Sequence, residues 1–352
     1  MKKLVSIVIL IFSVGFLQAS DKNISGKYVK QKTVKKNMSV RSDATLNVDN
    51  KYGSVIITTW DENVIDMEVT IKVSSNDEKW AVKRLDGIKV EISPGQSLFS
   101  AKTTFGKSDK SPRNSIISVN YVIKIPKNGN VQIVNKYGSV ITQDLNGKAD
   151  INCKYGKVSM GKLNNNKNNI DIQYCPNSDI KYIKSGTVSA KYSGLTITEF
   201  GDLTINSGYT DFQLSQGNTV KYQSNYGKLT FDKIKNIDGL GNYLTLTIEE
   251  LSESMKIKTN YSKIYLNQVL AKTKDIVVNG NYTNIDITHS SDYYYDFDIV
   301  TKYGNFKTNV DLEINSKVET MNTKSYSGFY KKSGNNVLRI SSNYGSINLS
   351  VK

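Results

Sequence analysis

The sequence predicts an all-β protein: a single-stranded parallel β-helix (β-solenoid) of about twelve coils, with an N-terminal α+β capping insertion. Three observations indicate this fold. A tyrosine-centred unit recurs along the chain, and apolar residues lie at fixed distances on both sides of each tyrosine. The composition, with 22 Tyr and 24 Gly but only four Pro, favours strands and turns over helices.

The repeated unit reads Asn-Lys-Tyr-Gly-Ser-Val in its clearest form, around Tyr52 and Tyr137. Successive tyrosines from Tyr137 onward are roughly 17 to 23 residues apart, as expected of one solenoid coil per repeat. We expect the tyrosines of neighbouring coils to stack into a structural ladder. The clear copies centre on Tyr52, Tyr137, Tyr155, Tyr226, Tyr303 and Tyr344, and the weaker ones on Tyr192, Tyr209, Tyr243, Tyr261, Tyr282 and Tyr326, with Tyr174 as a degenerate member.

The apolar residues around each tyrosine predict which side chains face the core. Apolar side chains recur six and four residues before it, as in Val131 and Ile133, and three residues after it, as in Val55. Alternate residues of a strand share a face, so the tyrosine itself is expected to point inward. The glycine that follows is expected to take a positive φ at the corner. Small or amide residues two positions before, such as Asn50 and Ser342, are expected to leave room for the ring.

The N-terminus has the pattern of a secretory signal peptide over residues 1–19. Lys2 and Lys3 precede an uncharged apolar run from Leu4 to Leu17, and Ala19 offers a small residue for cleavage. No later run approaches the length of a membrane-spanning helix, so the mature chain is expected to have no transmembrane segment. The expected location is the periplasm, the outer-membrane surface or the cell surface.

Three further segments follow the signal peptide. Residues 20–43 form an N-terminal segment, residues 44–130 hold the first coil and an insertion, and residues 131–352 carry the Tyr-Gly repeats. The insertion, residues 61–130, is expected to cap the exposed sheet edge of the first coil, with a ligand-binding head as the alternative. No cap is evident after the last repeat.

The insertion contains one expected helix and three expected strands. Asp77 is a helix N-cap residue, and the helix that begins at Glu78 places Trp80, Ala81 and Leu85 on one side. Gly87 is expected to end this helix. The strands are expected at residues 88–93, 97–105 and 115–125, with a polar stretch at 106–114.

The formal net charge of +15 restricts the partners of this chain. In an exported protein, a strongly basic surface favours an anionic glycan, the envelope surface or another envelope protein over nucleic acid. The alternative interpretation is a solvated lysine-rich surface that only keeps a repetitive β protein soluble.

The residue just before each tyrosine is expected to point outward and to form a stripe along the solenoid. Such a stripe would suit many weak contacts with a polymer or an anionic surface, which add through avidity. The alternative is that Lys and Asn simply tolerate exposure at tight corners. The stripe contains Lys51, Lys136, Lys154, Lys191, Lys302, Asn225, Asn242, Asn260, Asn281 and Asn343.

The residues that carry catalysis in other proteins are scarce. His289 is the only histidine and is expected at the surface in a polar turn. The alternative is a local cluster of His289 with the nearby acids Asp286, Asp292, Asp296 and Asp298. Cys153 and Cys175 are expected to be unpaired and partly buried, because they are offset along the strand direction by about 10 Å. We expect no metal, no cofactor and no enzymatic activity. The alternative is a β-helical lyase or hydrolase that acts on acidic polysaccharides.

The signal peptide, the recurring Asn/Lys-Tyr-Gly-Ser-Val units and the early copy from Tyr52 to Trp60 together resemble the putative adhesin family of bacterial envelope proteins, which is common in Bacteroidetes. The resemblance covers most of the chain from about Ala44 onward. It implies a secreted or surface-associated β-helical protein, and the family has no catalytic residues to carry over. The long insertion before Tyr137 departs from a plain repeat array.

Overall fold

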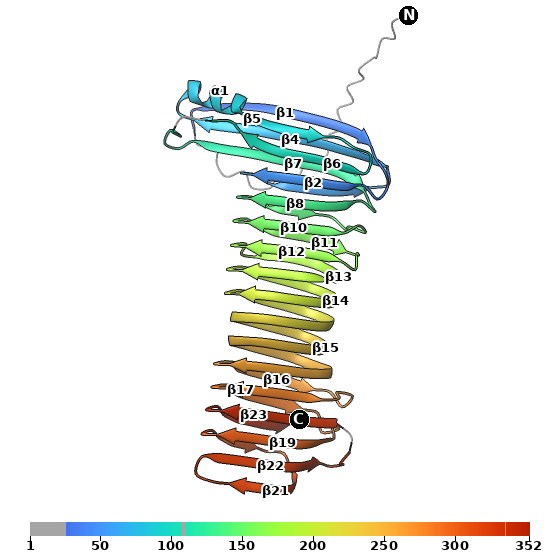
Figure 1. Ribbon diagram of the computed structural model, residues 1–352, viewed down its shortest axis with the longest axis vertical. Helices are drawn as coiled ribbons and strands as arrows, with labels where there is room; N and C mark the ends of the chain where they lie inside the picture. Colours follow the sequence, from blue (N-terminus) through green and yellow to red (C-terminus); the bar gives the residue numbers. More distant parts are fainter. Residues whose placement is uncertain (1–25, 108–109, 335) are drawn as a thin grey trace, which may run out of the picture.

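The computed structural model describes residues 26–107, 110–334 and 336–352 (Figure 1). The predicted signal peptide lies outside these described residues. The protein is all-β apart from a single helix in the described part, and its strands form one large sheet that stacks into an elongated, solenoid-like body.

Each repeat contributes one strand before its tyrosine and a second strand after it. Around Tyr137 these are β8 (Asn130–Lys136) and β9 (Val140–Thr142), and the next repeat supplies β10 (Ala149–Lys154) and β11 (Val158–Leu163). β8 pairs in parallel with β10, and β9 with β11, so equivalent apolar side chains stack in the core. The repeats continue in β12 (Asn168–Gln173), β13 (Ser178–Lys191), β14 (Gly194–Gly208), β15 (Asp211–Asn260), β16 (Lys263–Val269), β17 (Ile276–Asn281) and β18 (Asn284–His289).

The insertion extends both flanks of the first repeat, which consists of β2 (Thr45–Lys51) and β3 (Val55–Trp60). On one flank, β6 (Leu98–Phe105) runs parallel to β2, and β5 (Ile88–Ser93) is antiparallel to β6. On the other flank, β7 (Ile116–Pro126) is parallel to β3, and β4 (Val64–Ser75) is antiparallel to β7. β1 (Tyr28–Ser39), from the N-terminal segment, is antiparallel to β4 and extends this flank further. The insertion therefore lies over one end of the repeat stack (Figure 1).

The helix α1 (Glu78–Gly87) forms as the sequence predicted. The Asp77 side chain accepts a hydrogen bond from the Trp80 backbone N–H at 2.9 Å, which satisfies one of the free donors of the first turn. Trp80, Ala81 and Leu85 are buried. The three strands expected in the insertion are confirmed as β5, β6 and β7.

The C-terminal repeats do not stack in sequence order. β23 (Asn336–Asn343) pairs in parallel with β17 on one side and with β19 (Tyr295–Lys302) on the other. β24 (Ile347–Val351) likewise pairs with β18 and with β20 (Phe306–Thr308). The last repeat of the sequence is therefore inserted before the repeat of Tyr303.

A hairpin closes this end of the stack, where the sequence showed no cap. It consists of β21 (Glu313–Glu319) and β22 (Thr323–Tyr330), and β22 pairs antiparallel with β19. Tyr326, predicted as a weak repeat centre, lies buried on β22 opposite Ile299. That prediction was wrong because the segment around Tyr326 forms an antiparallel hairpin, not a corner between two parallel strands.

The tyrosines do not point inward as predicted. The twelve repeat tyrosines have φ between 49° and 63° and are exposed for 40–56% of their area. The parity argument assumed an extended backbone up to and including the tyrosine. A left-handed residue reverses the direction of its side chain relative to a strand residue, so the rings lie outside the core at the corner of each repeat.

The glycine after the tyrosine serves a different purpose from the one predicted. Among the described Tyr-Gly pairs, Gly227 is the only glycine with a positive φ. A Cβ at Gly138 would lie 1.9 Å from the carbonyl oxygen of Gly53 in the neighbouring repeat. Glycine is therefore required there by close contact between corners, while the tyrosine itself adopts the left-handed conformation.

The small and amide residues before the tyrosine also have another role than the predicted one. Asn135 Nδ2 donates to the Gly53 carbonyl at 3.0 Å, and Ser342 Oγ donates to the Thr283 carbonyl at 2.7 Å. Both side chains are buried. They satisfy carbonyl groups of the neighbouring corner, instead of leaving room for an inward ring.

His289 is buried, in contrast to the predicted surface position in a polar turn. Its Nε2 lies 3.0 Å from the Tyr295 hydroxyl, and its Nδ1 lies 2.9 Å from the Ser290 carbonyl oxygen. A carbonyl can only accept, so Nδ1 carries the proton and Nε2 accepts from Tyr295. Burial lowers the pKa of His289. The prediction failed because the following residues, Tyr293 and Tyr295, pack around the imidazole.

Candidate binding surface

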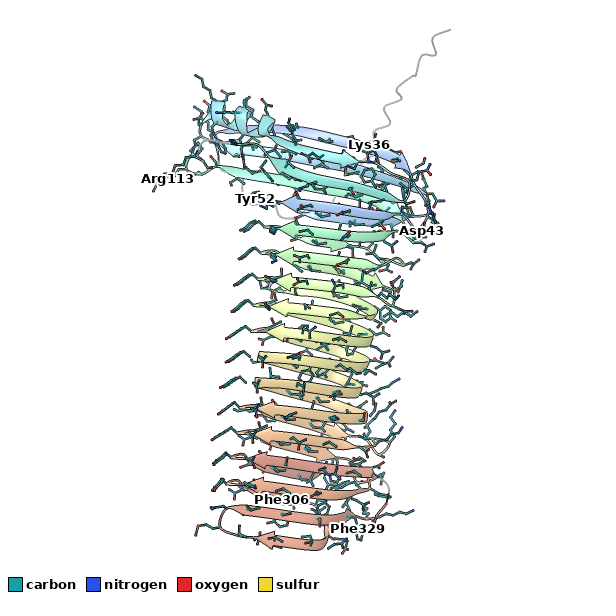
Figure 2. All side chains as sticks on the ribbon, in the orientation of Figure 1. Lys36, Asp43, Tyr52, Arg113, Phe306 and Phe329 are labelled. Carbon is teal, nitrogen blue, oxygen red and sulfur yellow. The ribbon has the colours of Figure 1, made fainter. Side chains whose placement is uncertain are left out.

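The repeat tyrosines form one continuous stack along an edge of the molecule. Successive ring centroids are 4.6–5.3 Å apart and the rings are within 2–11° of parallel. Figure 2 shows a row of side chains projecting from the edge at which Tyr52 lies. We call this row the tyrosine ladder. In spatial order it consists of Tyr52, Tyr137, Tyr155, Tyr174, Tyr192, Tyr209, Tyr226, Tyr243, Tyr261, Tyr282, Tyr344 and Tyr303.

The backbone conformation of the ladder shows that the rings contribute something specific. A left-handed conformation costs a bulky residue about 1–2 kcal/mol, and glycine or asparagine would adopt it more easily. Every one of the twelve positions nevertheless holds tyrosine. Each stacked pair contributes about 0.5–1.5 kcal/mol beyond area burial, which offsets this cost.

The stacking determines which part of each ring a partner can reach. An internal ring such as Tyr155 has a parallel neighbour on each face, at 5.1 Å and 4.9 Å. At the N-terminal end, Phe105 packs edge-on against Tyr52 at 5.6 Å. The ladder therefore offers ring edges to solvent, and an internal ring face is not available for stacking with a sugar.

The residues just before the tyrosines form a second column, parallel to the ladder. Backbone pairing places Lys51 beside Lys136 and Lys136 beside Lys154. Farther along, Lys302 pairs with Asn343. The column reads, in spatial order, Lys51, Lys136, Lys154, Gln173, Lys191, Gly208, Asn225, Asn242, Asn260, Asn281, Asn343 and Lys302. Sequence reasoning missed Gln173 and Gly208, which the repeat numbering around Tyr174 and Tyr209 identifies.

The lysines of this column have no carboxylate within ion-pair distance in the part of the chain that the structure describes. All five, at positions 51, 136, 154, 191 and 302, are exposed or half-buried. Other lysines on the same repeats are paired: Lys148 with Asp150 at 3.5 Å, and Lys157 with Asp179 at 3.1 Å. Four of the five column lysines fall in the first five repeats, so the positive charge is concentrated toward the N-terminal end of the column.

The asparagines of the column bond mainly to one another. Asn242 Nδ2 donates to Asn225 Oδ1 at 2.9 Å, and Asn260 Nδ2 donates to Asn242 Oδ1 at 2.7 Å. Asn281 and Asn343 continue the same chain at 2.8 Å each. Each internal amide thus retains one N–H and one oxygen lone pair for a partner.

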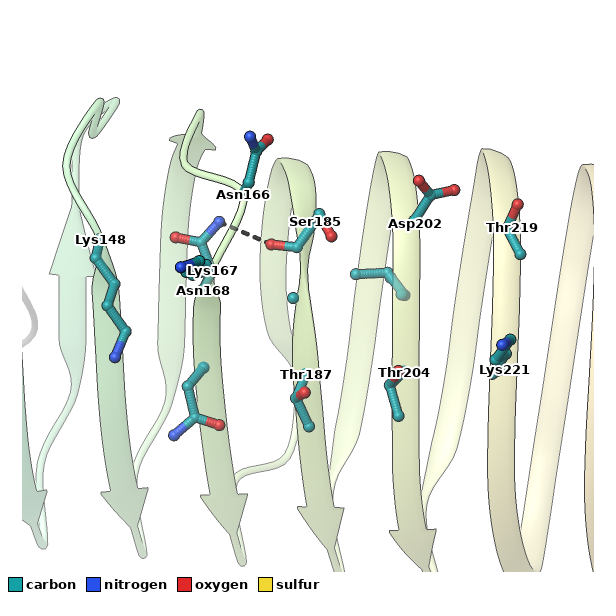
Figure 3. Close-up of a pocket in the computed structure, with 13 residues that line it drawn as sticks. Lys148, Asn166, Lys167, Asn168, Ser185, Thr187, Asp202, Thr204, Thr219 and Lys221 are labelled. Carbon is teal, nitrogen blue, oxygen red and sulfur yellow. Dashed lines mark hydrogen bonds between the residues drawn. The ribbon is translucent and has the colours of Figure 1, made fainter.

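A shallow polar hollow lies along one side of several central repeats, from the start of β10 across β12, β13, β14 and β15 (Figure 3). It has a volume of about 760 Å³, and its lining includes Lys148, Thr187, Thr204 and Lys221. Asn168 Nδ2 donates to the Ser185 carbonyl at 3.1 Å, which fixes one wall. Apart from Gly186 and Leu203, the lining is hydroxyl, amide and lysine groups with one carboxylate, from Asp202, so the hollow suits a hydrated polar ligand.

Two negative findings concern the described residues alone. They contain no group of three or more His, Cys, Asp or Glu side chains placed to hold a metal ion. Among them, no helix has the length and apolar character needed to cross a membrane.

Comparisons with known proteins return structures and no sequence families. No family model matches the chain, and no curated protein does. A "putative adhesin" from Parabacteroides merdae is 10% identical, with a TM-score of 0.37, over 90% of this chain and 96% of that one. A second "putative adhesin", from Parabacteroides distasonis, is 8% identical with a TM-score of 0.34, over 90% of this chain and 97% of that one.

A third similar structure is a "putative cell adhesion protein" from Clostridium sporogenes. It is 13% identical, with a TM-score of 0.19, over 92% of this chain and 100% of that one.

Proposed function

We propose that this chain is a non-catalytic, adhesin-like protein of the cell envelope that binds a linear anionic glycan along the column beside its tyrosine ladder. In this proposal the body is a parallel β-helix of about twelve coils, and no cofactor takes part. The observation that carries the proposal is the set of column lysines that lack a carboxylate partner in the described residues. The column lysines would bind the anionic groups of the glycan, and the column asparagines would form neutral hydrogen bonds with it. The lysines are Lys51, Lys136, Lys154, Lys191 and Lys302, and the asparagines are Asn225, Asn260, Asn281 and Asn343.

The geometry of the column favours a linear polymer over a small ligand. Adjacent repeats place one side chain each at a spacing close to the 4.6–5.3 Å of the ring stack. A single exposed Lys–anion contact is weak, but contacts that are linked along one polymer add through a high effective concentration. A chain with one anionic group per one or two sugars can therefore engage several lysines at once.

The tyrosine ladder supports the proposal in two ways. The stacking of its rings fixes the backbone at the corner of each repeat, so the Cα atoms of the neighbouring lysines lie in a regular row. Its half-exposed ring edges form a long, partly apolar border beside the charged column, and tyrosine is enriched at binding interfaces. The hydrogen-bonded asparagines of the column then extend the row of column lysines with neutral hydrogen-bond donors and acceptors.

The remaining parts of the chain fit the same proposal. Residues 1–19 would direct export, which would place the protein in the periplasm or at the cell surface. Residues 20–43 and 44–130 would close one end of the β-helix, and residues 131–352 would supply most of the binding surface. An anionic envelope surface or another envelope protein, the other partners that a basic column suits, are outcomes of the test.

The experiment compares binding of an acidic polysaccharide, polygalacturonate, to the unaltered chain and to a variant with all five column lysines replaced by Gln. The measurement is the dissociation constant at low and at physiological salt. We expect at least a tenfold weaker affinity in the variant, corresponding to about 1.4 kcal/mol. Each Lys contact contributes only a fraction of this free energy, and the variant removes five such contacts together.

The matched control replaces five exposed lysines outside the column by Gln, which changes the net charge by the same amount. These lysines are Lys36, Lys89, Lys184, Lys235 and Lys272. An equal loss of affinity in both variants would mean that binding follows net charge and not the column. Shortening of the polysaccharide during incubation would favour the enzymatic alternative. Binding to anionic vesicles or envelope proteins, without binding to the polysaccharide, would replace the glycan as partner.

A further inference from the structure

Cys153 and Cys175 lie in contact in neighbouring repeats, although their sequence positions suggested an offset beyond disulfide reach. Both side chains are fully buried and both are thiols in this structure. Cys175 Sγ donates a hydrogen bond to the Cys153 carbonyl oxygen at 3.3 Å. Both cysteines are free, as predicted, but they are fully instead of partly buried. The predicted offset of about 10 Å assumed one extended strand, which the corner at Tyr174 interrupts.

The corner at Tyr174 brings the two cysteines together. Cys153 pairs with Ile172 in the strand register, and Cys175 follows three residues later, beyond a tyrosine with φ of 53°. The left-handed residue turns the chain back, so that the residue after a tyrosine approaches the residue two before it. Within the single repeat of Tyr261, Thr259 and Ser262 show this approach, with their hydroxyls 2.7 Å apart. Cys153 is the register neighbour of Ile172, the residue two before Tyr174, so the corner brings Cys175 toward Cys153 as well.

We infer that Cys153 and Cys175 are the two halves of a disulfide that joins neighbouring repeats. The step uses a disulfide oxidant, either a small-molecule disulfide or the disulfide of a thiol oxidase. A thiolate of one cysteine attacks the oxidant disulfide and forms a mixed disulfide, releasing one thiol. The second cysteine then attacks the first sulfur and releases the second thiol, so two electrons and two protons pass to the oxidant.

Backbone carbonyls surround both thiols in the folded corner. Cys153 Sγ donates to the Gly138 carbonyl at 3.5 Å, and Cys175 Sγ donates to the Cys153 and Gln173 carbonyls at 3.3 Å each. Because both sulfurs are shielded in the folded chain, the exchange takes place before the corner closes, during folding.

The test refolds the full chain from denaturant with oxidised glutathione, then denatures it without reductant and labels free thiols with N-ethylmaleimide. We expect no label, a mass lower by two hydrogen atoms than that of the reduced chain, and a non-reduced peptide map in which Cys153 and Cys175 share one linked peptide. Reduction should lower the Tm, because the closed loop restricts the unfolded chain.

Single variants provide the control. Cys153→Ala and Cys175→Ala each lack the thiol that resolves the mixed disulfide. Each should therefore carry one glutathione, or one label where the thiol stays free, and give no linked peptide within one chain, and this expectation is independent of whether the variant folds stably. The peptide map of the unaltered chain needs no variant. Two labels per chain after oxidative refolding, or a linked peptide that joins two separate chains, would overturn the inference.

Discussion

The rings of Tyr282 and Tyr344 stack 4.7 Å apart and within 6° of parallel, although the complete repeat of Tyr303 separates them in the sequence. Tyr303 stacks on the other face of Tyr344, at 4.8 Å. The Tyr282 backbone N–H donates to the Asn343 carbonyl, and the Tyr344 N–H donates to the Lys302 carbonyl. The last repeat of the chain therefore joins two earlier parts of the stack.

This arrangement predicts a large effect of core truncation in the inserted strand. Ile340 is fully buried and lies between Val278 on β17 and Ile299 on β19. Ile340→Ala should lower the free energy of unfolding by about 2–5 kcal/mol. Arg339→Ala, a neighbour with an exposed 3.8 Å ion pair to Asp298, should cost about 0–1 kcal/mol. Denaturant unfolding measures both, and similar values for the two variants would contradict the insertion of β23.

Close contact between corners predicts that glycines differ in their tolerance of a methyl group. Gly138→Ala would place Cβ 1.9 Å from a backbone carbonyl, which must move, and should cost about 1–3 kcal/mol. Gly194→Ala meets no atom closer than Asn177 N at 3.5 Å and should change stability by less than about 1 kcal/mol. Thermal unfolding of both variants is the measurement. Equal Tm values would show that the corners are not in the contact described.

The stacking of the tyrosine ladder predicts a difference between its middle and its end. Tyr226 stacks at 4.6 Å on Tyr209 and at 4.8 Å on Tyr243, whereas Tyr303 stacks on Tyr344 alone among the ladder rings. Substitution by Asn relieves the same backbone strain at both positions. Tyr226→Asn should therefore be less stable than Tyr303→Asn by about 0.5–1.5 kcal/mol, the contribution of one aromatic pair. A reversed order in denaturant unfolding would mean that the stack does not stabilise the fold.

His289 predicts a loss of stability under mildly acidic conditions. Burial lowers its pKa in the folded chain below the ordinary value of about 6.5, so the unfolded chain binds a proton first as the pH falls. Its stabilising contribution is thus complete above about pH 6.5 and decreases as the pH falls toward the folded pKa. Denaturant unfolding between pH 7 and pH 5 should show this decrease, and His289→Phe should remove most of it. An unchanged pH dependence in the variant would assign the decrease to other groups.

The core of the repeats could be predicted from the sequence because it depends on simple periodicity. Residues such as Ile133 and Ile151 recur at the same distance from their tyrosines, and they pair across neighbouring strands as expected. Helix α1 could be predicted for a similar reason, because the Asp77 cap and the spacing of Trp80, Ala81 and Leu85 are local signals. The lysine column also follows from the repeat numbering.

The direction of the tyrosines could not be predicted by the same reasoning. In a Tyr-Gly pair, glycine is the residue expected to adopt a positive φ, so the left-handed conformation was assigned to Gly138 instead of Tyr137. The contact between Cys153 and Cys175 depends on that same corner. The order of the last repeats was also inaccessible, because a parallel strand such as β23 can pair with any edge that has a matching register.

The measurement that tests the binding proposal most directly is the affinity of the chain for polygalacturonate fragments of increasing length. Four column lysines, from Lys51 to Lys191, span four repeat steps, or roughly 20 Å. We expect the affinity to rise steeply with fragment length until one fragment spans these four lysines, and to rise little beyond that length. An affinity per binding site that is the same for the shortest and the longest fragments would contradict binding along the column.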